Sequence, residues 1–254
     1  MRGRLAIPLL LTLAILAAAA AASAELSQSG NLRISFDASF APRSLPRDHP
    51  APVTVSVEGS IATTDGTHPP ALRRLEIALN RNGTLSTWGL PACTAPLLQS
   101  TTTQRALERC RPALVGRGSF AAKVASERSP VPASGRILVF NGEFDGKPAL
   151  LLHLYGTVPV RVTFVLALTI SHHPEAQFGT ILSAPIPSSP AALDRSPTSA
   201  SRSVATTPTV AATSASSVPA APLPGAVFSF ARGSFYFADS RQLQITLTRD
   251  CHVR

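Results

Sequence analysis

The sequence predicts a mainly β protein, an antiparallel sandwich or barrel-like single domain with one short helix and a disordered insertion. Three observations predict this class: alternation of apolar and polar residues, recurring Asn-Gly and Asp-Gly dipeptides, and a tract of biased composition between strand-like regions. The predicted domain comprises residues 25–187 and 226–254. Residues 188–225 form the insertion, and residues 1–24 precede the domain.

Alternation at period two, the spacing of half-buried strands, dominates from Asn31 to Ile186. Residues 149–156 and 160–171 are more continuously apolar, which is typical of central strands buried on both faces. After the insertion the strand pattern returns. The positions predicted to share a face within their segments are Leu32, Ile34 and Phe36; Val53, Val55 and Val57; Leu75, Ile77 and Leu79; Phe228 and Phe230; Phe235 and Phe237; and Leu243, Ile245 and Leu247.

Turns are predicted where Asn-Gly or Asp-Gly separates two strand-like runs, at 65–66, 82–83, 141–142 and 145–146. These dipeptides tolerate the positive φ angles of tight hairpins. Asn82-Gly83-Thr84 also fits the N-glycosylation acceptor pattern, but we interpret it as a turn. The segment "NGEFDGK", residues 141–147, is interpreted as two turns flanking a very short strand.

The insertion differs sharply in composition from the rest of the chain. Of its 38 residues, 29 are Ala, Ser, Thr or Pro and none is aromatic, so it offers too little apolar surface to offset the entropy of ordering. We therefore predict disorder there. Because strand patterning resumes after it, the tract interrupts one domain rather than separating two.

The N-terminus has the pattern of a secretory signal peptide. Arg2 and Arg4 precede an apolar run from Leu5 to Ala22, and "ASA" at 22–24 is a small-x-small cleavage site. The alternative is an uncleaved single-span anchor. No later stretch is long and apolar enough to span a membrane as a helix. The expected localisation is therefore secreted or extracytoplasmic.

The formal net charge is +9 at pH 7, which makes anionic cell-wall polymers candidate partners. The basic residues are scattered rather than gathered into one stripe, so no specific nucleic-acid partner is predicted. Only Lys123 and Lys147 are lysines, and the preference for arginine is also what a GC-rich genome would produce.

Two of the three cysteines, Cys93 and Cys110, flank a segment with good helix formers from Gln104 to Arg109. A short helix folded back on its entry loop would bring the sulfur atoms together, and export would allow a disulfide. A zinc half-site and a reactive thiol are weaker alternatives, because close Cys spacing and a specific basic partner are missing. Cys251 is the odd cysteine, either free, capped by a small thiol or paired with another chain.

Catalytic motifs are missing: the sequence has no G-x-S-x-G, H-E-x-x-H, P-loop or G-x-G-x-x-G after a strand. Glu143 and Asp145 could serve as paired carboxylates, but turn polarity explains both. His153 in an apolar strand is interpreted as a satisfied core residue, and His172-His173 as a strand end or a loose metal site. Trp88 and Tyr155 are too few for an aromatic carbohydrate platform. No catalytic, cofactor or metal residues are predicted.

Ordered blocks covering most of residues 25–254 apart from the insertion resemble a group of exported β-rich proteins of high-GC actinobacteria, Solirubrobacter-like soil bacteria. The blocks include "GLPAC", "ALERCRPALVGRGSF", "LLLHLYG" and "RGSFYFADSRQLQITLTRDC". The resemblance implies an exported β domain with no established activity. It also implies a further cysteine before the last hairpin, which "PLPGAVFSFARGSF" lacks, so that Cys251 is expected to be a free thiol.

These observations favour a secreted or cell-envelope β domain with a binding or structural role, and not an enzyme. One alternative is a secreted hydrolase with dispersed residues, of which His153, Glu143 and Asp145 are the candidates. The other is a basic protein that binds cell-wall polymers or other polyanions.

Overall fold

The computed structural model describes residues 25–46, 51–124, 131–158, 161–173, 177–186, 203–210, 227–250 and 252–253. They form a mainly β domain, which confirms the predicted fold class. The strands are β1 Glu25–Ser29, β2 Leu32–Ala41, β3 Ser44–Leu45, β4 Thr54–Thr63, β5 Leu72–Asn80, β6 Cys93–Thr94, β7 Leu114–Val124, β8 Val131–Phe144, β9 Lys147–Val158, β10 Val162–His172, β11 Phe178–Pro185, β12 Ser203–Val210, β13 Val227–Phe237, β14 Gln242–Asp250 and β15 His252–Val253.

The helical part is small and lies in one place. The predicted helix over 104–109 is confirmed as α3, Thr103–Cys110, in which the Thr102 hydroxyl accepts a hydrogen bond from the backbone N–H of Arg105. A single turn, α2, covers Ala95–Leu98, and a 3₁₀ turn, η1, covers Arg111–Ala113. Together these elements form a short cap on the outer side of the sheet.

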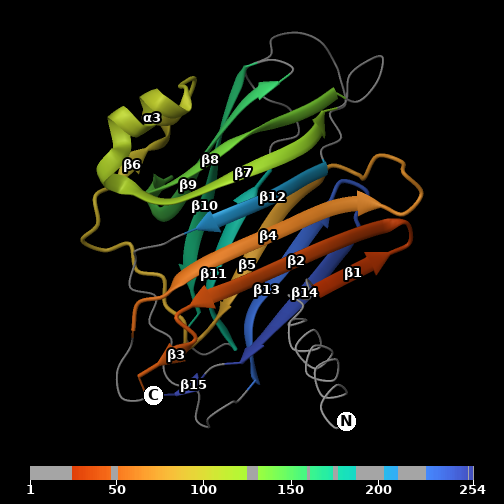
Figure 1. The fold of residues 1–254 in the computed structure, drawn as a ribbon, viewed down its shortest axis with the longest axis horizontal. Helices are drawn as coiled ribbons and strands as arrows, with labels where there is room; N and C mark the ends of the chain where they lie inside the picture. The colour runs from red at the N-terminus through yellow and green to blue at the C-terminus, as the bar shows by residue number, and fades with distance from the viewer. Residues whose placement is uncertain are drawn as a thin grey trace, which may run out of the picture.

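The strands follow one another in the order β1-β2-β4-β12-β7-β8-β9-β10-β11-β5-β13-β14, and every pairing along this order is antiparallel. In Figure 1, β12, β4, β2 and β1 cross in front of β11, β5, β13 and β14, so the rolled sheet has two layers. Its two ends meet, because β1 lies beside β14. Arg249 of β14 pairs there with Glu25 of β1 and with Asp37 of β2.

Apolar side chains fill the interior between the layers. Phe36 of β2 meets Phe235 of β13 edge to face, with ring centroids 5.8 Å apart, and Phe40 packs against Phe230 at 5.1 Å. The middle of strand β8, residues 137–142, is buried on both faces, as expected for a central strand. Its Ile137 and Val139 face the interior, whereas Leu138 and Phe140 pack beneath α2 and α3.

One predicted turn is wrong. Asn141 and Gly142 lie within β8, opposite Leu150 and Ala149 of β9, so "NGEFDGK" is not two turns around a short strand. The hairpin turn is Asp145-Gly146, where both residues have positive φ, at 50° and 69°. The contacts of Asn141 and Gly142 with a distant loop, described below, explain why this dipeptide is extended.

The Asp-Gly at 65–66 and the Asn-Gly at 82–83 do form turns, but neither joins neighbouring strands of a hairpin. Within the predicted insertion, residues 203–210 form β12 between β4 and β7, which differs from the disorder expected there. Val and Thr in this segment favour a strand. Residues 188–202 and 211–225, the predicted signal peptide at 1–24, and Cys251 lie outside the described residues.

Candidate ligand-binding pocket

The loop from β5 to β6, residues 81–92, forms one wall of a pocket. It begins with a turn in which the backbone N–H of Gly83 donates to the carbonyl oxygen of Asn80 at 2.8 Å. Leu85 then points into the core beside Ile170 and Leu182 and is only 7% exposed. This single apolar anchor fixes the middle of a loop whose other side chains are largely exposed.

A second turn places Trp88 at the pocket. The backbone N–H of Leu90 donates to the carbonyl oxygen of Thr87 at 3.3 Å, and Gly89 has a φ of 75°. A positive φ at the third residue defines a type II turn, which places Trp88 at the corner. Trp88, the only tryptophan of the chain, is 93% exposed. A large aromatic side chain so exposed is unusual, since tryptophan is mostly buried in proteins.

The far end of the loop is fastened by β6 and the predicted disulfide. Cys93 pairs with Gly142 and Thr94 with Glu143 in a short parallel ladder between β6 and β8. Cys93 is bonded to Cys110 at the end of α3, with Cα atoms 5.6 Å apart. This disulfide therefore joins the helical cap to the strand that closes the loop.

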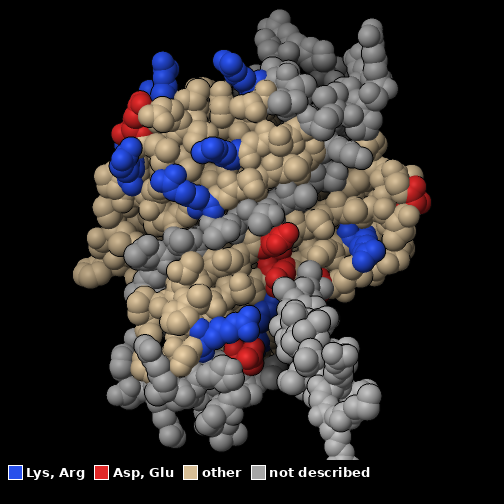
Figure 2. Space-filling model, in the orientation of Figure 1, with Lys and Arg blue, Asp and Glu red and all other residues tan. Residues whose placement is uncertain are grey.

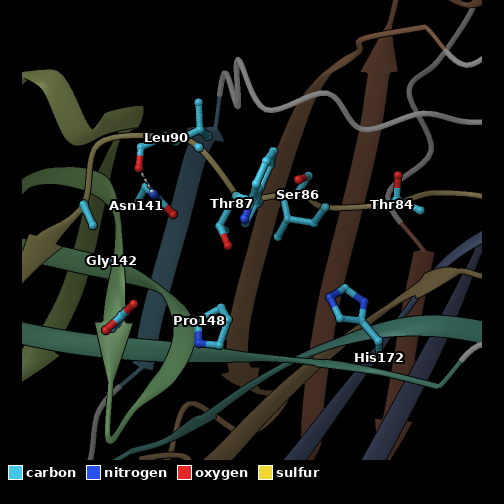
Figure 3. Close-up of a pocket in the computed structure, with 13 residues that line it drawn as sticks. Thr84, Ser86, Thr87, Leu90, Asn141, Gly142, Pro148 and His172 are labelled. Carbon is cyan, nitrogen blue, oxygen red and sulfur yellow. Dashed lines mark hydrogen bonds between the residues drawn. The ribbon is translucent and has the colours of Figure 1, made fainter.

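Asn141 holds the loop from the sheet side. It is 3% exposed, and its Nδ2 donates to the carbonyl oxygens of Leu90 at 3.4 Å and Pro91 at 3.0 Å. Because both partners only accept hydrogen bonds, the amide orientation is fixed by chemistry. The Oδ1 atom has no partner among the described residues. Figure 3 shows this oxygen turned away from Leu90 and toward the hollow.

The pocket between the loop and the β8–β9 end has a volume of about 570 Å³, within the range of small-molecule sites. Figure 3 shows Thr84, Ser86 and Thr87 along the loop, Pro148 facing them from β9, and the ring of His172 directed up from β10. The described residues that line the pocket are Thr84, Leu85, Ser86, Thr87, Trp88, Gly89, Leu90, Ala92, Asn141, Gly142, Glu143, Pro148 and His172.

Among the residues singled out from the sequence, Glu143 and His172 line this pocket together, whereas Asp145 occupies the hairpin turn. His172 Nδ1 lies 3.3 Å from the Thr180 hydroxyl. His153 is elsewhere, because Glu143 pairs with Pro148 and His153 follows five residues along β9, about 17 Å away at strand spacing. No group of three or more His, Cys, Asp or Glu that could hold a metal occurs in the described part of the chain.

Trp88 and Asn141 were not predicted as site residues. Trp88 could have been suspected as a lone tryptophan beside glycine in a polar loop. Asn141 gave a misleading signal, because Asn-Gly is the strongest short hairpin dipeptide.

His153 is a buried core residue, as interpreted from the sequence, but it is not fully satisfied, because its Nδ1 has no hydrogen-bond partner among the described residues. It is fully buried, and its Nε2 lies 3.0 Å from the carbonyl oxygen of Thr101, in the loop between α2 and α3. That carbonyl also accepts a hydrogen bond from the Thr163 hydroxyl at 2.7 Å. Since a carbonyl only accepts, Nε2 carries a proton. The buried Nδ1 has no partner among the described residues that would accept a second proton's hydrogen bond, which favours the neutral imidazole. His153 thus ties the helical cap to the sheet.

This burial predicts a loss of stability in mild acid. Desolvation lowers the pKa of His153 below its ordinary value of about 6.5, although the Thr101 hydrogen bond opposes the shift. When the pH falls below about 6.5, His153 binds a proton in the unfolded chain but not in the folded chain. The free energy of unfolding should therefore fall by up to about 1.4 kcal/mol per pH unit until the native pKa is reached.

Urea unfolding of wild type, His153→Gln and His68→Gln between pH 8 and pH 5 measures this effect. His68 is exposed, so His68→Gln should keep the wild-type slope, whereas His153→Gln should flatten it. Equal slopes in all three proteins would contradict the assignment.

A separate surface on the outer face is strongly basic. Arg105 of α3, Arg111 of η1, Arg117 of β7 and Arg136 of β8 are exposed, and none forms an ion pair with another described residue. Figure 2 shows basic side chains gathered over this region, around α3 and the outer face of β7 and β8. We call these four arginines the basic face.

No helix among the described residues has the length and apolarity needed to cross a membrane. Comparison with protein-family models, with curated proteins and with solved structures finds no match to this chain. The fold and the pocket define the class of protein. It is a mainly β domain with a disulfide between Cys93 and Cys110 and a polar pocket beside an exposed tryptophan.

Proposed function

We propose that the protein is an extracytoplasmic binding protein without a catalytic role, and that the pocket beside Trp88 is its ligand site. One observation carries the proposal: the buried Oδ1 of Asn141 faces the pocket and has no hydrogen-bond partner in the part of the chain that the structure describes. A buried acceptor left unpaired costs about 1–3 kcal/mol, and buried polar atoms are rarely left so. A ligand with an O–H or N–H group would satisfy it.

The lining favours binding over catalysis. The carboxylate of Glu143 has no hydrogen bond or ion pair with another described residue that would orient it as an acid or base. Ser86 and Thr87 are hydroxyl residues of the loop, and neither has a hydrogen bond to a histidine among the described contacts. Nucleophilic catalysis requires such a bond between the nucleophile and its base. The disulfide and the signal-like N-terminus support a location outside the cytoplasm.

The basic face supports a second candidate function, binding of an anionic polymer. Four exposed arginines that form no ion pair with the described residues lie on one side of the molecule; they would attract polyanions, and salt would weaken that attraction. The basic face and the pocket are separate sets of residues, so the two functions can be tested independently.

Trp88 provides a direct assay for the pocket, because no other tryptophan contributes to the fluorescence of the protein. We expect at least one class of hydrogen-bond donors among millimolar sugars, amines and amides to shift its emission. Asn141→Leu should weaken that response at least tenfold, since one charge-neutral buried hydrogen bond is worth about 1 kcal/mol and the apolar side chain also leaves the ligand donor unpaired.

Asn31→Leu is the matched control. Asn31 lies in the β1–β2 turn and bonds Asp65 and Arg241, far from the pocket in sequence and in the sheet. Its replacement should leave the fluorescence titration unchanged. A panel in which no class of donor shifts Trp88 emission would overturn the proposed function.

A further inference from the structure

The ligand class can be narrowed from the pocket itself, if the proposed function holds. Trp88 presents its indole almost entirely to solvent at the corner of a type II turn. The face of an indole ring is electron-rich, whereas its edge is electron-poor. It therefore attracts weakly positive C–H groups as well as cations, and a flat ligand can lie against it without moving the backbone.

The polar side chains that line the same pocket include both acceptors and donors of hydrogen bonds. Asn141 Oδ1 and the Glu143 carboxylate accept hydrogen bonds, while Ser86 and Thr87 have hydroxyl groups that both donate and accept. A ligand bearing several O–H groups satisfies all of them, because each hydroxyl also both donates and accepts. An amine would supply donors only, and would leave the hydroxyl donors of the loop without a partner.

The charge of the lining excludes most anions and disfavours cations. The described residues that line the pocket include no lysine or arginine, so phosphate, sulfate or a carboxylate would meet no guanidinium or ammonium group of theirs. Among the described residues that line the pocket, Glu143 is the one carboxylate and it is exposed, in a chain whose formal net charge is +9. An uncharged ligand fits this balance best.

We infer that the pocket binds an uncharged pyranose sugar, with one C–H face of the ring on Trp88 and ring hydroxyls on Asn141 Oδ1 and Glu143. Because Trp88 is so exposed, a sugar that lies on it can be a unit of a longer chain. The sequence alone argued against a carbohydrate platform because aromatic residues are few. The single exposed tryptophan and the unpaired amide oxygen form a site for one ring instead.

Three variants and four probes test this inference. Calorimetry and saturation-transfer NMR would be run with glucose, a neutral gluco-oligosaccharide, tetramethylammonium and polygalacturonate. We expect binding of the oligosaccharide, with saturation of its ring C–H protons. Trp88→Ala should abolish that binding, Trp88→Tyr should restore a part of it, and Asn141→Leu should weaken it at least tenfold. Trp88 is so exposed that its replacement should not alter the unfolding transition.

The probes separate the possible failures. Binding of tetramethylammonium alone, lost in Trp88→Ala, would overturn the sugar assignment and leave the pocket a binding site. If polygalacturonate alone binds, and this binding is unaffected by Trp88→Ala and lost in salt, the sugar assignment is wrong and the basic face binds an anionic polymer. If none of the four binds while a donor from the wider fluorescence panel does, only the sugar class is wrong. If glucose binds as well as the oligosaccharide, the ligand is a free sugar rather than a chain.

Discussion

Replacing Cys93 and Cys110 together by alanine should lower the free energy of unfolding by about 3 kcal/mol. The bond closes a loop across 17 residues, and cross-links of this span restrict the unfolded chain by about that amount. Both cysteines are also buried, in the cluster that packs the helical elements against β8, so the cost is not confined to the unfolded state. Urea unfolding of the oxidised wild type and the double variant measures the difference.

Reductant supplies the matching control. Wild type treated with reductant should unfold at nearly the urea concentration of the double variant, and the double variant should not respond to reductant. Ligand binding should weaken too, because β6 holds one end of the loop that carries Trp88. Wild type that unfolds at the same urea concentration with and without reductant would show that the bond contributes nothing to stability.

The strands could be predicted because their signal is local. Alternation in Leu32–Phe36 or Leu243–Leu247 reflects one face toward the interior, and both segments are strands with that face buried. The disulfide could be predicted for a similar reason, since a short helix between the two cysteines is a local feature that brings their sulfur atoms together. By contrast, the order of the strands depends on contacts between distant segments. For example, nothing in the local residue pattern of β5 indicates that this strand lies between β11 and β13.

The pocket could not be predicted, because its residues come from distant parts of the chain and one of them violates a local rule. Trp88, Asn141 and His172 belong to a loop, to β8 and to β10. Asn141-Gly142 has the chemistry of a turn and is nevertheless extended inside a buried strand. Such conflicts between local preference and global structure are expected at functional sites. The turn that was wrongly predicted at Asn141-Gly142 thus lies at the pocket.

Gly142→Ala tests this conflict, and we expect it to lower the free energy of unfolding by about 1–3 kcal/mol, the usual cost of overfilling a packed site. A Cβ atom at Gly142 would lie 2.4 Å from the carbonyl oxygen of Cys93 and 2.7 Å from Leu151 Cδ1. The first of these is backbone and cannot rotate away, so β6 must move from β8. Because β6 ends the Trp88 loop and Asn141 adjoins Gly142, ligand binding should weaken in the same variant.

Gly156→Ala is the control, since it lies in the neighbouring strand β9 of the same sheet. A Cβ atom there would meet Val162 Cγ1 at 3.5 Å and Phe120 Cζ at 3.6 Å, which are ordinary van der Waals contacts. The free energy of unfolding of Gly156→Ala should differ from that of wild type by less than about 1 kcal/mol, and its ligand affinity should be that of wild type. If Gly142→Ala instead unfolds at the same urea concentration as Gly156→Ala and keeps full affinity, the close approach of β6 to β8 does not position the pocket. A greater loss of stability and of ligand affinity in Gly142→Ala would show that Asn141-Gly142 is extended because only glycine leaves room for β6. It would also show that this contact positions the unpaired amide oxygen of Asn141 at the ligand.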